Sequence, residues 1–169
     1  RFEVFYAKVH DDKRIEPDDQ MALWGRTYQL RITHGKFSYR IAEDYIDVSS
    51  VLDNNLAIKK KIYAQEILNM LKRLDSIVLA TISVVGLKPI PIKIKYLRSK
   101  FGSYHRRHDE ITLNSFLARL NPIYLEYVIY HEYAHALVFN HSKDFYDVLD
   151  IMMPNHKKYQ KDLKKIALH

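Results

Sequence analysis

Residues 131–141 read His-Glu-Tyr-Ala-His-Ala-Leu-Val-Phe-Asn-His, with three histidines and one glutamate close together in the chain. On an α-helix, residues four apart project from the same face, so His131 and His135 can bind one metal ion. Glu132 lies beside them, where a carboxylate can act on a water bound to that ion. His141 follows six residues after His135 and offers a third imidazole. Three nitrogen ligands and one water are usual for a catalytic zinc site, so the expected cofactor is Zn²⁺.

The residues around the histidines predict one buried helix followed by a second. Asn121 is a suitable N-cap, and Pro122 fits the first turn, where its missing N–H costs nothing. Asn140 is predicted to close this helix, because asparagine tolerates the left-handed conformation. Ser142 can then cap the next helix. His141 would lie on the corner between the two, from which it can turn back toward the metal.

Peptide hydrolysis at such a site needs further polar groups. The tetrahedral oxyanion needs a hydrogen-bond donor, and the sequence does not choose between Tyr104, His105 and Arg98. His105 and His108 belong to a polar turn and are not expected to bind the catalytic metal. Each ligand histidine should donate its second N–H to an acceptor. The acceptors that lie nearby in the sequence are Asp144, Asp147 and Asp150.

Several segments of the chain resemble the YgjP-like metallopeptidase family. The most specific runs from Tyr127 to Pro154 and contains the His-Glu-x-x-His core, an Asn-His-Ser corner, an aromatic residue three positions later and a Met-Pro pair. Upstream, residues 98–103 are similar to the family's Arg-x-x-Trp-Gly-Ser segment, and residues 111–114 to the strand that follows it. A weaker likeness at 23–28 extends the resemblance over roughly residues 20–155.

The resemblance implies a zinc-dependent metallopeptidase, with His131, His135 and His141 as metal ligands and Glu132 as the catalytic base. It implies a protein or peptide substrate. The family is related to the SprT-like and WLM-type proteases, which process proteins on DNA. A DNA-associated protease of protein–DNA complexes is therefore an alternative function. A non-enzymatic zinc-binding scaffold is another, in which a side chain would close the fourth zinc position.

The chain departs from the family pattern at three positions. Phe101 stands where tryptophan is usual, Tyr104 where many relatives carry cysteine, and Tyr146 where tryptophan is common. None of these departures touches the metal ligands, so the zinc prediction survives them. They can alter the substrate cleft.

Composition is that of one globular domain: 169 residues, of which 47% are hydrophobic and 28% charged. Cysteine is absent, which excludes disulfides and thiolate zinc sites. Its absence fits a reducing compartment, so we expect a cytoplasmic location. The most apolar run, Ile77 to Leu87, is too short for a membrane span, which needs about 18 residues.

The net charge of +7 is concentrated in two basic segments. Residues 88–107 contain seven lysines and arginines and no acid, and residues 155–169 contain five lysines against Asp162. Such segments can attract nucleic acid, although a solvated surface is the plainer interpretation. Nucleic acid is therefore a possible partner, and the sequence leaves the oligomeric state open.

The alternation of apolar residues predicts that residues 1–50 form a β-rich segment. Alternating apolar residues at Phe2–Tyr6 predict a strand. The segments Tyr28–Ile32 and Phe37–Ile41 flank His34-Gly35 and predict a hairpin, and Tyr45–Val48 predicts a further strand. The lone Trp24 is interpreted as a packing anchor.

Residues 51–169 are expected to form a zincin-like core. Together with residues 1–50 they should make one compact domain. A helix capped by Asp53 or Asn54 should pack behind the metal helix, with Lys59–Lys61 and Lys72 in solvent. Alternation over residues 90–96 predicts a strand, and residues 101–104 and 111–114 predict a hairpin near the metal that can pair with substrate backbone. The predicted fold is α+β and zincin-like: N-terminal β-hairpins and a mixed or antiparallel sheet packed on an active-site helix and a backing helix.

Overall fold

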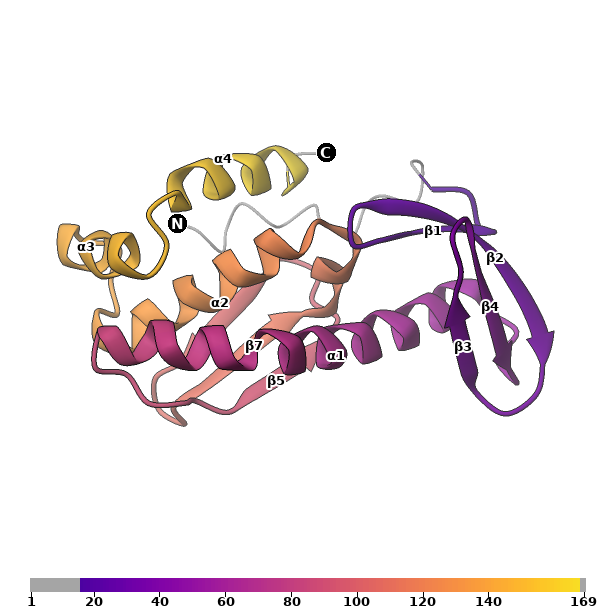
Figure 1. Cartoon of the computed structure of the whole chain (residues 1–169), viewed down its shortest axis with the longest axis horizontal. Helices are drawn as coiled ribbons and strands as arrows, with labels where there is room; N and C mark the ends of the chain where they lie inside the picture. The colour runs from indigo at the N-terminus through magenta and orange to yellow at the C-terminus, as the bar shows by residue number, and fades with distance from the viewer. Residues whose placement is uncertain (1–15, 168–169) are drawn as a thin grey trace.

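The computed structural model describes residues 16–167 and has an α+β fold (Figure 1). A four-stranded sheet comes first, followed by a long helix, a three-stranded sheet and three further α-helices. The predicted fold class is confirmed. The predicted strand at Phe2–Tyr6 lies outside the described residues, and the domain division at residue 50 stays a prediction. None of the described helices has both the length and the apolar character needed to cross a membrane.

The N-terminal sheet has the strand order β1-β2-β4-β3. Strands β1 (Gln20–Leu23) and β2 (Arg26–His34) form a hairpin that the sequence analysis missed. Its two-residue turn places Trp24 at φ 49° and Gly25 at φ 85°, positive values that match the twist of paired strands. The Trp24 ring packs against the core, as predicted, and its Nε1 donates to Glu66 Oε1 at 3.1 Å.

The predicted hairpin between residues 28–32 and 37–41 is wrong. Strand β4 (Tyr45–Ser50) lies between β2 and β3 (Ser38–Ile41), parallel to β2 and antiparallel to β3. Burial explains this order. Alternate residues of β4 are buried, whereas β3 is largely exposed and suits an edge. Strand β4 therefore has a neighbour on each side, whereas β3 has one among the described strands.

Helix α1 (Asn55–Val84) begins at the predicted cap, because the Asn54 side chain accepts from the Ala57 N–H at 3.1 Å. It ends just before Gly86, which has φ 80°. The prediction that Lys59 is solvated is wrong: the residue is 5% exposed, and its Nζ donates to Glu16 Oε2 at 2.9 Å. This part of α1 faces the N-terminal sheet, which lies over the end of the helix in Figure 1.

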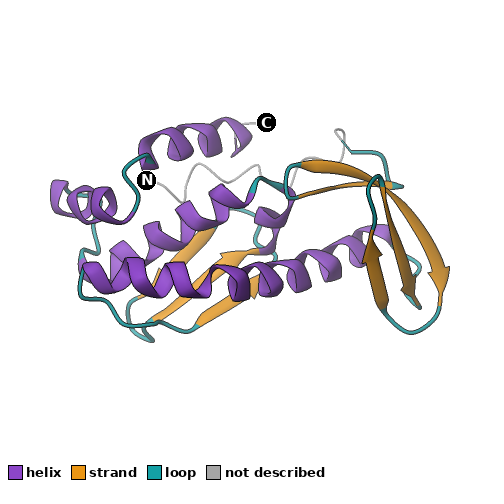
Figure 2. Ribbon diagram, viewed as in Figure 1, coloured by secondary structure: helices purple, strands orange, loops and turns teal. Residues whose placement is uncertain are grey.

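The second sheet has the order β5-β7-β6. Strands β6 (Gly102–His105) and β7 (Glu110–Asn114) form the predicted antiparallel hairpin, and β5 (Ile92–Lys95) lies parallel to β7. A 3-10 helix, η3 (Ser115–Arg119), then leads into α2 (Pro122–Leu137). Helix α1 contacts β5 while α2 contacts β6 and β7, so both helices pack on this sheet (Figure 2). Among the described residues, β6 is an edge strand of this sheet.

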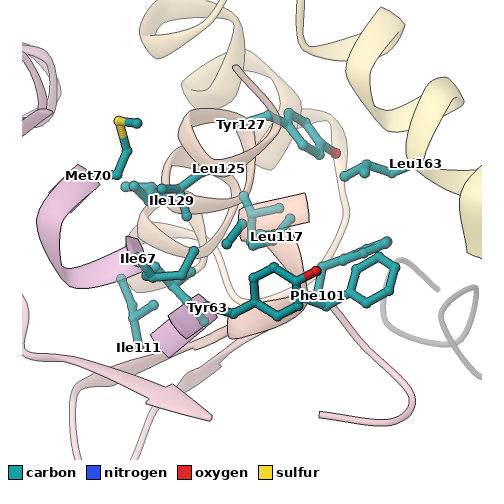
Figure 3. Packing of buried hydrophobic residues seen from close by; sticks show 14 of the residues in the cluster. Tyr63, Ile67, Met70, Phe101, Ile111, Leu117, Leu125, Tyr127, Ile129 and Leu163 are labelled. Carbon is teal, nitrogen blue, oxygen red and sulfur yellow. The ribbon is translucent and has the colours of Figure 1, made fainter. Parts of the chain in front are cut away.

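Two shorter helices complete the chain, α3 (Lys143–Met152) and α4 (His156–Ala167). Their apolar residues join the same buried cluster as those of α1, α2, η3 and both sheets. Figure 3 shows this packing around Leu117 of η3, with Ile67 from α1, Ile129 from α2 and Leu163 from α4. The helix that carries the histidine motif is therefore surrounded on several sides, which makes it a rigid support.

Candidate metal centre

Helix α2 holds the first two histidines in a fixed, buried position. It starts as predicted, with the Asn121 side chain accepting from the Ile123 N–H at 3.0 Å and Pro122 in the first turn. Its central residues are buried around the whole circumference, which is the pattern of a helix enclosed by the fold. His131 and Glu132 are 0% exposed and His135 is 7% exposed. The side chains at the motif therefore have little freedom to move.

The end of α2 differs from the prediction. The helix stops at Leu137, and Val138 is already extended at φ −132°, so Asn140 lies beyond the helix and does not close it. Among the described residues only Trp24, Asp109, Gly25 and Gly86 have positive φ, so Asn140 is not left-handed. The early stop lengthens the connection to α3, which begins after Ser142 as predicted. His141 comes from this connection.

The three histidines converge, as the sequence predicts. One ligand nitrogen from each of His131, His135 and His141 lies within 4.8 Å of the others, and these are the residues among those described that can form such a group. The Nε2 atoms of His131 and His141 are 3.4 Å apart. His105 and His108, which are exposed in the β6–β7 turn, do not belong to the group. This arrangement has the size and the donor chemistry of a site for one metal ion.

The Nδ1 atoms of two of the candidate ligands lie near polar atoms. Tyr127 Oη lies 3.4 Å from His131 Nδ1, and the Val138 carbonyl lies 3.3 Å from His135 Nδ1. A proton held on Nδ1 leaves the lone pair of Nε2 for the metal. The Tyr127 contact follows from helical spacing, since Tyr127 is one turn before His131, whereas the Val138 carbonyl belongs to the extended residue just past the end of α2. The sequence analysis did not identify either.

The aspartates suggested as acceptors for these histidines have other partners. Asp147 accepts from Lys143 Nζ at 2.9 Å, and Asp150 faces His156 Nε2 at 2.5 Å. Asp144 is exposed in the first turn of α3. The suggestion rested on nearness in sequence alone, and all three aspartates are exposed on α3.

Phe145 forms an apolar wall beside all three histidines. It is 0% exposed, and its ring centroid is 5.0 Å from that of His131, 4.6 Å from that of His135 and 5.0 Å from that of His141. Tyr146 is also close, with its ring 6.5 Å from that of His141. Of the three departures from the family pattern, Tyr146 therefore lies near one of the candidate ligands.

The protonation state of the site favours metal binding. Burial lowers the pKa of His131 well below its usual value of 6.5, and the neighbouring His135, His141 and His156 lower it further. A neutral imidazole is the form that binds a metal, so no proton needs to be displaced from His131 near neutral pH. The residues present thus fit a divalent ion by position and by charge state.

Glu132 lies between α2 and the edge strand β6. A Cβ atom added at Gly102 would be 3.2 Å from Glu132 Oε2 and 2.7 Å from Val128 Cγ1. The absence of a side chain at position 102 therefore lets the β6 backbone approach the carboxylate closely. Glu132 thus follows His131 on α2 and lies against strand β6.

The three predicted oxyanion donors occupy different environments. The Tyr104 hydroxyl donates to Asp109 Oδ1 at 2.6 Å, and its pKa is raised to about 12, first by burial and then by that hydrogen bond. Arg98 lies exposed in the loop before β6, and His105 is exposed at the end of the strand. The choice of an oxyanion donor among them stays a prediction.

The turn between β6 and β7 contacts the loop that follows α2. The guanidinium of Arg106 lies 5.4 Å from the centre of the Phe139 ring, which in turn is 6.1 Å from that of His135. A cation over an aromatic face is an attractive arrangement. It ties the β6–β7 turn to the loop that follows α2.

Comparison with known proteins identifies the family. A comparison with curated proteins finds no match to this sequence. Among solved structures, the crystal structure of the metallopeptidase zymogen abylysin of Pyrococcus abyssi is similar, with 20% sequence identity and a TM-score of 0.47. That alignment covers 55% of this chain and 90% of the other. The family described as "YgjP-like, metallopeptidase domain" matches residues 2–166. Because this match runs over nearly the whole sequence, the chain belongs to the YgjP-like metallopeptidase domain family.

Proposed function

We propose that the protein is a zinc-dependent peptidase in which His131, His135 and His141 bind zinc and Glu132 is the general base. The observation that carries the proposal is the convergence of three imidazole nitrogens within 4.8 Å, with the buried carboxylate of Glu132 on the same turn of α2. Membership of the family supports peptidase activity. The donor set supports zinc, since three imidazoles and an open fourth position are typical of catalytic zinc.

The reaction divides between the metal and the carboxylate. Zinc held by three imidazoles would lower the pKa of a water molecule toward ~7 and polarise the peptide carbonyl. Glu132 accepts the proton of the attacking water on a carboxylate oxygen and delivers it to the leaving amine. Its burial keeps bulk water from competing for those oxygens. The wall formed by Phe145 excludes water from the ligand side in the same way.

The edge strand β6 supports a protein or peptide as substrate. An extended chain that pairs with the free edge of β6 would run past Gly102, where the strand comes closest to Glu132. Main-chain hydrogen bonds would then place a peptide carbonyl near the metal ligands independently of side-chain sequence. Arg98, Tyr104 and His105 lie on or next to this strand, which supports them as candidates for contact with the substrate or the oxyanion.

The proposal is tested by Glu132→Gln, with Glu126→Gln as a control on the same helix. The chain is loaded with zinc, and metal content and cleavage of labelled casein are measured with and without a chelator. We expect one zinc in every variant and cleavage that the chelator abolishes. Glu132→Gln should lower the rate about 100-fold or more, as expected when a general base is lost, and Glu126→Gln should leave it unchanged. Cleavage by Glu132→Gln at the parent rate would exclude this residue as the base.

Binding of nucleic acid is a second candidate function, supported by the basic segments 88–107 and 155–169. In Figure 1, β5 of the first segment and α4 of the second lie on either side of α2. Binding through phosphates requires an affinity that falls steeply with salt. Titration of labelled duplex DNA at two salt concentrations tests this, and salt-independent binding would argue against it.

The metal-binding scaffold is the weaker alternative. Among the described residues, the candidate ligands are three histidines with no fourth side chain to close the site, which favours an accessible fourth position. Membership of a metallopeptidase family also favours an enzyme over a scaffold. A cytoplasmic location, supported by the lack of cysteine, stays a prediction.

A further inference from the structure

A further histidine, which is buried, lies near the three candidate ligands. His156, the first residue of α4, is 0% exposed, and its Nε2 lies 2.5 Å from Asp150 Oδ1. Its Nδ1 has no hydrogen-bond partner among the described residues. The remaining histidines in the described range, His34, His105 and His108, are exposed. A buried imidazole costs stability unless its contacts offset the loss of water, so its position requires an explanation.

The ring of His156 stacks on Tyr146. The ring centroids are 5.9 Å apart and the planes differ by 19°, which is close to parallel. Tyr146 in turn packs near His141, with centroids 6.5 Å apart and planes 32° apart. Tyr146 and Asp150 are four residues apart on α3 and so lie on the same face of that helix. The contacts form a continuous series from Asp150 through His156 and Tyr146 to His141.

His141 depends on such contacts more than the other ligands do. His131 and His135 are held by the buried helix α2, and their Nδ1 atoms face the Tyr127 hydroxyl and the Val138 carbonyl. His141 follows the end of α2 and is only half-buried. Its direction is therefore set by what packs around it, and α3 supplies the rings.

We propose that Tyr146 and His156 are positioning residues that hold the His141 ring toward the metal, with Asp150 fixing the orientation of His156. The proposal rests on the proposed role of His141 as a metal ligand. It couples the docking of α4 to metal affinity, because His156 belongs to α4 while Tyr146 belongs to α3. Residues that orient a metal ligand typically contribute about 10- to 100-fold to metal affinity.

The test uses the full chain and measures two properties of the metal site that do not depend on catalysis. Zinc affinity is measured by competition with a chelating indicator, and the visible absorption of bound Co²⁺ reports the geometry of the ligands. We expect His156→Ala and Asp150→Ala to weaken zinc binding about 10- to 100-fold and to change the Co²⁺ spectrum. His156→Phe keeps an aromatic ring against Tyr146 but loses the contact with Asp150, so its zinc affinity should lie between those of His156→Ala and the parent.

Asp162→Ala is the matched control for Asp150→Ala. Asp162 also ties α4 to the rest of the fold, since its Oδ2 accepts from Tyr124 Oη at 2.8 Å, but it lies away from the stacked rings. We expect this variant to lose stability and to keep the zinc affinity and Co²⁺ spectrum of the parent. An equal loss of zinc affinity in both variants would overturn the proposal, because it would point to general loosening of α4.

Tyr146→Leu keeps the proposal falsifiable if His156→Ala does not fold. Tyr146 is half-buried, so its replacement should be tolerated, and the zinc affinity should fall as for His156→Ala. Parent-like zinc binding by folded Tyr146→Leu would overturn the proposal. Failure of the parent itself to bind zinc would instead overturn the proposed function, so the two failures are distinguishable.

Discussion

Gly102 on strand β6 lies directly against Glu132 on helix α2, so closely that an added Cβ would be 3.2 Å from the Glu132 Oε2 atom. The same Cβ would be 2.7 Å from Val128 Cγ1, a contact that requires something to shift. We predict that Gly102→Ala displaces the carboxylate or the strand and lowers kcat/KM about 10- to 100-fold, a typical effect of misplacing a catalytic group by an ångström. Zinc binding should be retained, because no ligand histidine is touched.

Ser103→Ala is the control for this prediction. Side chains alternate across a strand, so Ser103 points to the face of β6 opposite Gly102. Its replacement should leave kcat/KM unchanged within the error of the assay. Equal activity of Gly102→Ala and the parent on labelled casein would show that the close approach to Glu132 has no catalytic role.

Asn114 is a second residue whose replacement should have a large effect, in this case on stability. It is 0% exposed, and its side chain makes four hydrogen bonds to the backbone: Oδ1 accepts from Leu97 N and Phe116 N, and Nδ2 donates to Leu97 O and Lys100 O. Asn114→Ala leaves several of these groups without partners. We predict a loss of about 2–4 kcal/mol in the free energy of unfolding, measured by urea denaturation.

The control for Asn114 is Asn55→Ala. The amide of Asn55 donates to Asp18 at the surface, where water can replace the lost bonds. Asn55→Ala should therefore lower the free energy of unfolding by no more than about 0.5 kcal/mol. If the two variants lost the same free energy, the loop from residue 97 to residue 100 would not depend on Asn114.

The convergence of the candidate metal ligands could be predicted from the sequence because the positions of these histidines depend on local rules. Helical periodicity places His131 and His135 on one face, and the cap at Asn121 and Pro122 fixes where α2 begins. The β6–β7 hairpin is equally local. The end of α2 was misplaced, because Asn140 is a suitable closing residue but the chain leaves the helix at Val138. The propensity of one residue is weaker than the packing of its neighbours.

Features that depend on competition between distant segments could not be predicted. The position of β4 between β2 and β3, parallel to one and antiparallel to the other, is decided by pairing across the whole sheet. The burial of Lys59 depends on Glu16, which is far from it in sequence. The stacking of His156 on Tyr146 likewise requires α4 to return to α3. Tyr127 was within reach of sequence reasoning, since it lies four residues before His131.

The burial of His131 predicts a specific pH dependence for the metal-free protein. Its pKa in the folded state is lowered well below 6.5, chiefly by burial, so the folded protein keeps it neutral where the unfolded chain binds a proton. The unfolded state then binds more protons, and the free energy of unfolding falls as the pH drops below about 6.5. His131 alone can lower the free energy of unfolding by up to about 1.4 kcal/mol for each pH unit of acidification.

Denaturation in the presence of a chelator, between about pH 8 and about pH 5, measures this slope. His131→Asn should flatten the slope, because the titrating group is removed, whatever its effect on stability at neutral pH. His34→Asn changes an exposed histidine and should leave the slope as in the parent. An identical slope in His131→Asn and the parent would assign the pH dependence to other groups.

The buried ion pair between α1 and the N-terminal segment predicts an asymmetry between its two partners. Glu16 Oε2 accepts from Lys59 Nζ at 2.9 Å, while its Oε1 accepts from Ala22 N at 2.7 Å and lies 3.4 Å from Arg119. Removing the carboxylate leaves two cations poorly compensated, so Glu16→Gln should cost about 3 kcal/mol or more in the free energy of unfolding. Lys59→Met should cost less, because Glu16 keeps Arg119 and the Ala22 N–H as partners.

Lys72→Met, at an exposed position on the same helix, is the control and should be nearly neutral in urea denaturation. A larger loss for Lys59→Met than for Glu16→Gln would show that the lysine, and not the shared carboxylate, is the centre of this network.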